Sequence, residues 1–174
     1  MAQHFSAASA TELRALGALK LIVFDVDGVM TDGRFALNST GEETKTFHTQ
    51  DGFGMRRLLD HGIAVAVITG RDSGAVSARM RELGVEHVFQ GCRDKAATID
   101  TLLATLAIES QHAAAVGDDI PDLAMFDAVA VRIAVANAVA EVHRAAGWVT
   151  VKQGGHGAVR EIADAVIAAR EALQ

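Results

Sequence analysis

Short apolar runs alternate with helix-like segments along most of the sequence. Five runs have the length and composition of buried parallel strands: Leu21–Phe24, Ile63–Ile68, Val85–Phe89, Ala113–Val116 and Val129–Val135, the last with room for one or two strands. Helical patterns follow at 74–83 after a cap at Ser73, at 95–106 after a cap at Asp94, at Val139–Ala146 and at Ala158–Leu173. Repeated strand–helix units favour right-handed crossovers, so we expect an α/β fold with a doubly wound, mostly parallel, Rossmann-like sheet flanked by helices.

One segment, at residues 33–50, departs from this alternation. Phe35 and Leu37 alternate with small or polar residues, and a second alternating stretch runs from Thr44 to Thr49. The turn-forming residues Asn38–Glu43 lie between them, which predicts a β-hairpin. The insertion is far too short to form a cap domain. Because an isolated hairpin is marginal in water, we expect it to pair with another subunit.

Composition narrows the class of protein. A chain of 174 residues, half of them hydrophobic, is long enough for one domain with a substantial core. We expect an N-terminal arm at residues 1–18, loose from Met1 to Ala10, and a single domain at 19–174. The lone Cys92 excludes an internal disulfide and fits a reducing cytoplasm.

Charge and hydropathy exclude several partners. A net charge of −6 argues against nucleic acid as a ligand. The longest apolar stretches are too short to cross a membrane, and the N-terminal residues lack the pattern of a signal peptide. An anionic substrate would therefore have to be attracted by local cations.

Polar residues that could take part in catalysis or ligand binding follow the predicted strands at their carboxyl ends. They are Asp25, Asp27, Thr69, Lys95, Asp118 and Asp122. A parallel sheet gathers these ends at one edge, where open α/β sheets bind ligands. Several carboxylates in one place need a cation, and hard oxygen ligands suit Mg²⁺. A carboxylate can also attack phosphorus, while a second acid protonates the leaving oxygen and then activates water. A solvated turn with an aspartate cap is the plainer alternative for the first pair.

Four ordered motifs carry a resemblance to a known superfamily. They are Asp25-Val-Asp27-Gly28-Val29, Thr69-Gly70-Arg71, Lys95 and Gly117-Asp118-Asp119-Ile-Pro-Asp122, and they resemble the motifs of the haloacid dehalogenase superfamily from Leu19 to about Val135. The resemblance implies that Asp25 is the nucleophile and Asp27 the general acid/base.

The same resemblance implies the remaining roles at this site. Mg²⁺ would be bound by the side chains of Asp25 and Asp118 and by the backbone carbonyl of Asp27. Thr69, Gly70 and Lys95 would hold the phosphoryl group. Asp122 would orient the metal site, together with Asp119, which could instead simply cap the next helix.

A narrower resemblance covers nearly the whole chain. The runs FDVDGVMTDG, HTQDGFGMRRL, ITGRDSGAVSARMRELG and GDDIPDL, with the tail GGHGAVRE, are similar to the family of 3-deoxy-D-manno-octulosonate 8-phosphate phosphatases, which serve lipopolysaccharide precursor synthesis. Members lack a large cap and form homotetramers in which hairpins build a central barrel and a neighbour's C-terminal tail completes each site. Such a barrel would bury Phe35, Leu37 and Phe47. Residues Val131, Arg132 and Asn137 depart from the family pattern, which bears on specificity.

The implied substrate is a sugar acid phosphate. Contacts implied by the resemblance come from Asp27, His48, Thr49, Gln50, Asp51, Gly52, Arg56, Arg71, Arg79 and Lys95. The guanidinium fork of arginine suits the carboxylate of such a substrate. Plainer roles exist for several of these residues: Arg79 on a solvated helix face, His48 as an ordinary hairpin residue, and Arg56 with Arg57 covering a surface helix.

Three alternatives remain open at the level of sequence. A non-catalytic oligomerisation module of this fold would be expected to lose motif acids, and none is lost. A phosphomutase would need a cap to reorient its substrate, and the chain has no room for one. A phosphatase of the same build that acts on another sugar acid phosphate, such as a nonulosonate 9-phosphate, is poorly separated by sequence.

Overall fold

A single parallel sheet organises the molecule, which is described here from a computed structural model covering residues 3–5 and 8–173. The elements are α1 (Ala10–Gly17), β1 (Leu21–Phe24), β2 (Ala36–Leu37), β3 (Glu43–Thr44), α2 (Thr49–Asp60), β4 (Ala64–Ile68), α3 (Gly74–Leu83), β5 (His87–Phe89), α4 (Lys95–Leu106), η2 (Ser110–His112), β6 (Ala113–Gly117), η3 (Ile120–Asp122), α5 (Leu123–Asp127), β7 (Val131–Ala134), α6 (Ala140–Ala145), β8 (Trp148–Val149) and α7 (Ala158–Glu171).

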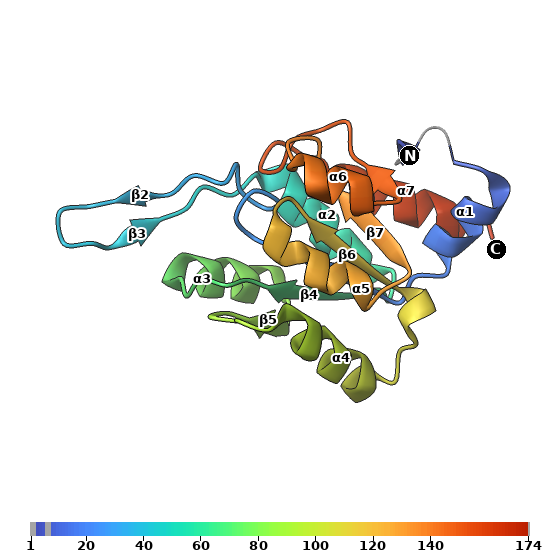
Figure 1. The fold of residues 1–174 in the computed structure, drawn as a ribbon, viewed down its shortest axis with the longest axis horizontal. Coiled ribbons are helices and arrows are strands. Elements are labelled where there is room, and N and C mark those ends of the chain that lie inside the picture. The colour runs from blue at the N-terminus through green and yellow to red at the C-terminus, as the bar shows by residue number, and fades with distance from the viewer. Residues whose placement is uncertain (1–2, 6–7, 174) are drawn as a thin grey trace.

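The six-stranded sheet has the order β5-β4-β1-β6-β7-β8, and every neighbouring pair is parallel (Figure 1). The chain starts at the central strand β1 and winds outward to both sides, which confirms the predicted doubly wound α/β fold. Among the described residues, no helix is long and apolar enough to cross a membrane.

Strand β1 shows why the predicted strands are apolar throughout. Ile22 and Phe24 belong to a core cluster formed with α1, α2, α3 and α7, whereas Leu21 and Val23 belong to a second cluster formed with α4, α5 and α6. All four side chains are fully buried. A strand covered by helices on both faces has no solvated side, so it carries no polar alternation.

The predicted strands and helices lie close to their expected bounds, and the structure adds elements that were not predicted, among them α1, α5 and β8. The Asp94 carboxylate accepts a hydrogen bond from the Ala97 N–H at 3.0 Å, as expected of a helix cap. Ser73 precedes α3, but its hydroxyl makes no such bond. The stretch Val129–Val135 holds one strand. Helix α2 was suggested only by a surface face under Arg56 and Arg57.

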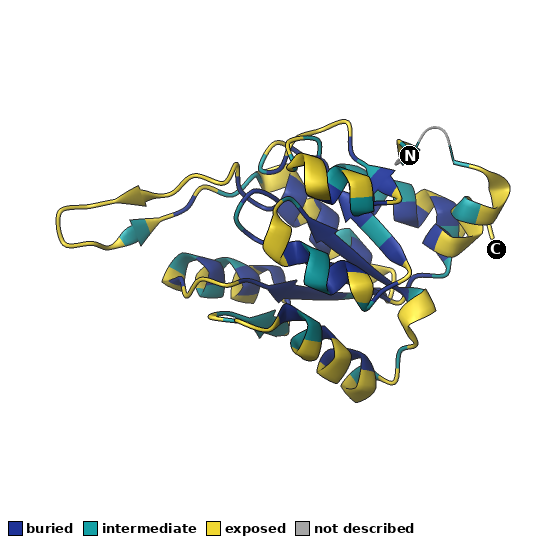
Figure 2. Cartoon of the chain, in the orientation of Figure 1, coloured by how far each residue is buried: buried dark blue, intermediate teal, exposed yellow. Residues whose placement is uncertain are grey.

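The hairpin formed by β2 and β3 projects away from the sheet and is largely exposed (Figure 2). It pairs over fewer residues than the alternation predicts. The chain leaves the ladder after Thr44 because the Lys45 side chain turns into the body and Phe47 packs against the core. Phe47 is therefore partly covered within its own chain, whereas Leu37 remains 60% exposed.

The N-terminal arm is attached to the sheet at the described positions. Gln3 forms a parallel bridge with Trp148, through hydrogen bonds from the Gln3 N–H to the Gly147 carbonyl (3.1 Å) and from the Val149 N–H to the Gln3 carbonyl (2.9 Å). Phe5 stacks on Trp148 with ring centroids 5.1 Å apart. The prediction of a loose arm is wrong for these residues, while positions 1–2 and 6–7 lie outside the described part.

Helices α2 and α7 pack closely, and Asp51 ties them together. The Asp51 carboxylate accepts hydrogen bonds from the backbone N–H groups of Gly157 (3.2 Å) and Arg160 (2.9 Å), which begin α7. Asp51 is buried, and Gly54 lies where a larger residue would press on the Arg160 backbone. A carboxylate at a helix N-terminus satisfies N–H groups that have no partner within the helix.

This contact generates a stability prediction. Asp51→Ala leaves two N–H groups without their acceptor, so we expect the free energy of unfolding to fall by roughly 1–3 kcal/mol. Urea unfolding followed by circular dichroism measures the change. Asp60→Ala, at the exposed far end of the same helix, is the matched control and should leave the midpoint unchanged. Equal midpoints for the two variants would contradict the proposed capping role.

Candidate active site

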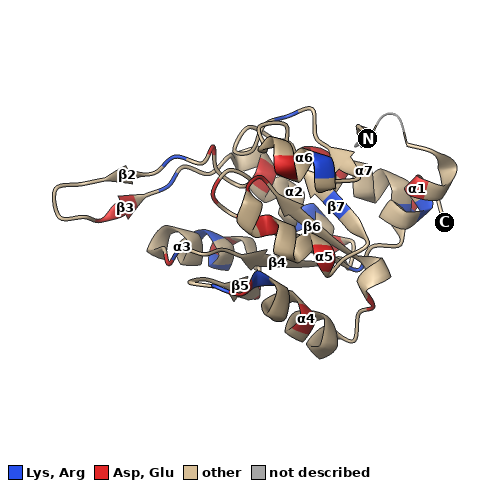
Figure 3. Cartoon of the chain, in the orientation of Figure 1, with Lys and Arg blue, Asp and Glu red and all other residues tan. Residues whose placement is uncertain are grey.

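A cavity of about 340 Å³ opens at the carboxyl edge of the sheet. The residues around it are Asp25, Asp27, Thr69, Gly70, Arg71, Cys92, Arg93, Asp94, Lys95, Asp118, Asp119, Pro121, Asp122 and Ala124. They follow β1, β4, β5 and β6. These strands are parallel neighbours, so their carboxyl ends lie at the same edge of the sheet. Figure 3 shows acidic and basic residues at these strand ends. The structure thus brings together all the predicted catalytic, phosphate-binding and metal-site residues.

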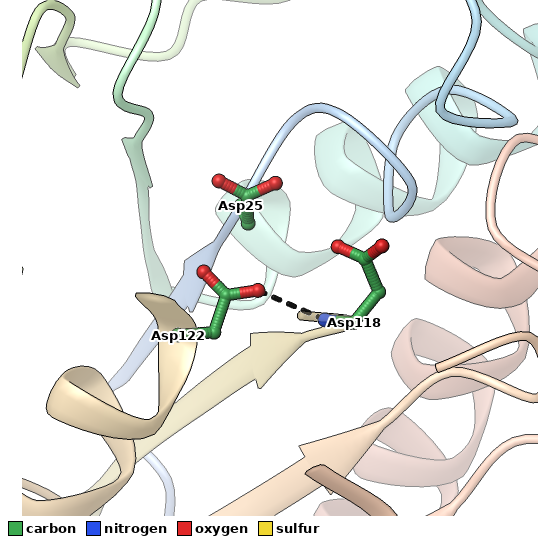
Figure 4. Close-up of side chains that lie close together, drawn as sticks. All are labelled: Asp25, Asp118 and Asp122. Atoms are coloured by element: carbon green, nitrogen blue, oxygen red, sulfur yellow. Dashed lines mark hydrogen bonds between the residues drawn. The ribbon is translucent and has the colours of Figure 1, made fainter. Parts of the chain in front are cut away.

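Three carboxylates converge in this cavity. Oxygen atoms of Asp25, Asp118 and Asp122 lie within 4.8 Å of one another (Figure 4). Asp25 follows β1, Asp118 follows β6, and Asp122 ends the short helix η3. Carboxylates so close together repel one another unless cations lie between them. A set of hard oxygen ligands of this kind fits Mg²⁺.

Lys95 is the cation that the chain itself supplies. Its Nζ atom lies 2.6 Å from Asp25 Oδ1 and 2.7 Å from Asp122 Oδ1, and its side chain is 7% exposed. Burial alone would lower the pKa of Lys95, but attraction by the two carboxylates outweighs it and raises that pKa above its usual value. One ammonium group cannot balance three ionised carboxylates, so full ionisation of the site would leave an excess of negative charge.

The hydrogen bonds of Asp122 and Asp118 differ. Asp122 Oδ2 accepts from the backbone N–H groups of Asp118 (2.9 Å) and Asp119 (3.2 Å), while Oδ1 accepts from Lys95. No described residue donates a hydrogen bond to the Asp118 carboxylate. Both oxygens of Asp122 therefore have partners, one in the loop after β6 and one in Lys95, whereas the Asp118 carboxylate is free to bind a cation.

Burial and repulsion hold protons on the two remaining acids. Desolvation, followed by repulsion from Asp122, raises the pKa of Asp25 to about 7. Desolvation, followed by repulsion from Asp25, raises the pKa of Asp118 to about 8. Both acids are thus reluctant to ionise without a further positive charge, as expected of a metal-binding pair.

Close backbone packing brings the first motif against the fourth motif and against the loop before α7. Gly28 has φ +102°, and a side chain there would collide with the Asp118 carboxylate. Asn137 donates from Nδ2 to the Gly28 carbonyl (3.2 Å) and accepts from the Gly154 N–H (2.6 Å). From the sequence, Asn137 stands out only as a departure from the family pattern. The structure makes it the link between the loop after β1 and the loop before α7.

Asp27 lies at the side of the cavity that faces the hairpin. Its Oδ1 atom pairs with Lys45, and its Oδ2 atom lies 4.0 Å from Arg71 Nε. Arg71 also pairs with Glu43 of β3. Lys45 and Glu43 were absent from the predicted site, because nothing in the alternating pattern of the hairpin shows which side chains turn inward.

Several predicted substrate contacts lie away from the cavity of their own chain: His48, Thr49, Gln50, Asp51, Gly52, Arg56 and Arg79. Asp51 caps α7, as described above. Arg56 donates to the Leu83 carbonyl at 3.0 Å and lines a separate hollow with Ala64 and His87, where β4 and β5 begin. Arg79 pairs with Glu82 and lies against Gly52. These residues therefore do not line the cavity that holds Asp25, and their contact with a substrate stays a prediction.

The fold and the cluster of strand-end acids with a lysine define a haloacid dehalogenase-like hydrolase, and a family model of that description matches residues 88–162. The 3-deoxy-D-manno-octulosonate 8-phosphate phosphatase of Yersinia pestis is 40% identical over 90% of this chain and 83% of its own length. The chain belongs to this family of phosphatases and is a phosphoric monoester hydrolase.

Solved structures agree with that assignment. The Moraxella catarrhalis 3-deoxy-D-manno-octulosonate 8-phosphate phosphatase, solved with a magnesium ion, a phosphate ion and a KDO molecule, gives a TM-score of 0.88 at 39% identity, over 92% of this chain and 94% of that one. The cobalt-bound enzyme of the same kind from Haemophilus influenzae gives 0.88 at 37% identity, over 90% and 92%. The family relation therefore extends to the three-dimensional fold.

The raised pKa values generate a prediction about pH and Mg²⁺. Between about pH 4 and pH 8 the folded protein retains protons on Asp25 and Asp118 that the unfolded chain has lost, so these acids make the free energy of unfolding fall as pH rises. Mg²⁺ bound between the two carboxylates would replace these protons. We expect Mg²⁺ to raise the melting temperature clearly more at about pH 8 than at about pH 5.5.

Differential scanning fluorimetry with and without Mg²⁺ measures this difference. Asp118→Asn should lose most of the Mg²⁺ shift at about pH 8 and flatten the fall in melting temperature measured without metal. Asp127→Asn, on the exposed end of α5, serves as control and should behave as wild type. An equal Mg²⁺ shift at both pH values would refute the role assigned to these carboxylates.

Proposed function

We propose that residues 19–174 act as one Mg²⁺-dependent phosphatase domain that hydrolyses 3-deoxy-D-manno-octulosonate 8-phosphate to the free sugar acid and phosphate. The single observation that carries the proposal is the Asp25 carboxylate at the end of β1, held by Lys95 beside Asp118. The family membership of the chain and the KDO molecule in the Moraxella catarrhalis structure favour this substrate.

In the proposed reaction Asp25 is the nucleophile. Lys95 occupies Oδ1, and no described residue donates a hydrogen bond to Oδ2, so Oδ2 is the oxygen available to attack phosphorus. A P–O bond forms to Asp25 as the bond to the sugar oxygen breaks, and Asp27 transfers a proton to that oxygen. Asp27 then accepts a proton from the water that attacks the aspartyl phosphate, which returns Asp25 as a carboxylate.

The surrounding residues stabilise this charge transfer. We assign the metal to the side chains of Asp25 and Asp118 and the backbone carbonyl of Asp27, with Asp119 and Asp122 holding the loop. Bound Mg²⁺ would neutralise charge on these carboxylates and on the phosphoryl oxygens. Thr69, Gly70 and Lys95 border the same cavity and would bind the phosphoryl group.

Recognition of the sugar acid would rest on cations at the mouth of the cavity. Arg71 lines it, and its side chain is 46% exposed, so a substrate carboxylate could compete with Glu43 for the guanidinium group. The remaining predicted contacts at 48–52, Arg56 and Arg79 would have to come from a neighbouring subunit, which makes a homotetramer part of the proposal.

Replacement of the nucleophile tests the mechanism. Asp25→Asn should keep the fold and lose turnover on the order of thousands-fold or more, because an amide neither attacks phosphorus nor binds Mg²⁺ well. Phosphate release from a panel of phosphorylated sugar acids measures both activity and substrate choice. Asp127→Asn is the control. Turnover by Asp25→Asn within tenfold of wild type would exclude Asp25 as nucleophile, and a stronger preference for another sugar acid phosphate would replace the proposed substrate.

The exposed hairpin tests the assembly. Leu37 is 60% exposed on β2, so Leu37→Glu should break a tetramer built from hairpins and weaken substrate handling while the α/β core stays folded. Light scattering gives the mass, and circular dichroism reports the fold. Leu13→Glu, on exposed α1, is the control for a charge placed on an apolar surface. A wild-type monomer with full activity would overturn this part of the proposal.

A further inference from the structure

A buried lysine lies at the root of the hairpin. The Lys45 side chain is fully inaccessible to solvent, although the residue follows directly on the exposed strand β3. Lysine is almost never fully buried unless its charge is paired, because desolvating an ammonium group is unfavourable. Lys45 therefore has a specific partner inside the molecule, and its nearest one is the Asp27 carboxylate.

The contacts of Lys45 divide the two oxygens of Asp27. Lys45 Nζ pairs with Asp27 Oδ1 and lies 3.2 Å from Glu43 Oε1. Among the described residues, the only cationic atom within 4.0 Å of Asp27 Oδ2 is Arg71 Nε, and a separation of 4.0 Å is too long for a hydrogen bond. One oxygen of the carboxylate is thus held by Lys45, while the other has no hydrogen-bond donor among the described residues and remains available for proton transfer.

Three further side chains, Glu43, Arg71 and Phe35, contact one another or the pair of Lys45 and Asp27. Glu43 pairs with Arg71 as well as with Lys45, and the hydrogen bond from Arg71 is the chief cause that lowers the pKa of Glu43 to about 2. The ring of Phe35 covers both cations, 4.1 Å from Arg71 Cζ and 5.6 Å from Lys45 Nζ. With both acids ionised the four side chains carry no net charge, and the group gains one positive charge when Asp27 Oδ2 takes up a proton.

A merely structural role for Lys45 would be to fasten the hairpin to the body. The pair of Glu43 with Arg71, whose side chain is 46% exposed, already joins β3 to the loop after β4. The position of Lys45 adds something different, because it fixes the orientation of one particular carboxylate that faces the cavity. That difference separates the two roles experimentally.

We propose that Lys45 is a positioning residue that holds Asp27 Oδ1 so that Oδ2 exchanges the proton with the leaving oxygen and then with water. The proposal rests on the proposed function of Asp27 as acid and base. When the P–O bond to the leaving group breaks, the proton on Oδ2 moves to the leaving oxygen, and Oδ1 keeps its hydrogen bond to Lys45. In the second step Oδ2 takes a proton from the attacking water.

The leaving group provides the test. p-Nitrophenolate departs without a proton, whereas phenolate is more basic and an alkoxide still more so, and these need the acid. We expect Lys45→Met to lower kcat/KM for phenyl phosphate and for 3-deoxy-D-manno-octulosonate 8-phosphate on the order of tenfold to a hundredfold, and for p-nitrophenyl phosphate by much less. Lys45→Gln, whose amide can donate to Oδ1, should recover part of the loss.

Two controls keep the roles distinguishable. Arg34→Met removes a hairpin cation that is exposed and makes no ion pair with a described residue. This variant should leave kcat/KM for all three esters unchanged. Crystal structures of the variants add a readout besides activity, since Asp27 should lose its single orientation in Lys45→Met and keep it in Arg34→Met. Equal losses on all three esters, or an unmoved Asp27 in Lys45→Met, would overturn the proposal.

The outcomes also separate this inference from the proposed function. The two aryl esters carry no sugar, so they report on Lys45 whichever sugar acid phosphate is preferred. Wild-type turnover of the aryl esters without turnover of 3-deoxy-D-manno-octulosonate 8-phosphate would refute the substrate and leave the Lys45 comparison intact. In an enzyme without aryl ester turnover, the orientation of Asp27 in the crystals alone decides the inference.

Discussion

Repulsion among carboxylates at the end of β1 and β6 is the constraint on which the site depends. Asp25, Asp118 and Asp122 would move apart if the backbone allowed it. They are held by a fully buried parallel register in which Phe24 lies opposite Val116, so the residues that follow cannot separate. Lys95 compensates only part of the charge, and the remaining excess is what a divalent cation would balance. The apolar strands thus supply the rigidity that the chemistry needs.

The part of the site built from strand ends could be predicted from the sequence. An apolar run such as Leu21–Phe24 indicates a buried parallel strand, whose carboxyl end lies at the edge of the sheet where ligands bind. The sequence therefore predicts that Asp25 and Asp118 lie at that edge, and both line the cavity there. Lys95 was found in the same way, because Asp94 marks the start of α4. Local pattern and topology suffice where the backbone alone fixes a residue.

Contacts made by side chains across long sequence separations could not be predicted in this way. Lys45 reaches Asp27 because the chain leaves the hairpin at that residue, and Asn137 joins two loops that are distant in sequence. Asp51 was predicted to contact the substrate, yet it caps α7 within its own chain. Hydrophobic periodicity describes which face is buried, and says nothing about which polar partner a turned side chain meets.

The bridge between Gln3 and Trp148 bears on how the protein tolerates changes at its N-terminus. Strand β8 is the outermost strand of the sheet, and an outermost strand with free N–H and carbonyl groups is a template for pairing between molecules. Gln3 hydrogen-bonds to the Gly147 carbonyl and the Val149 N–H at this edge, and Phe5 stacks on the indole ring of Trp148. A truncation past Phe5, or a bulky fusion that displaces it, would leave the backbone groups of β8 without partners. We expect such a protein to keep its active site and to aggregate through pairing of β8 between molecules.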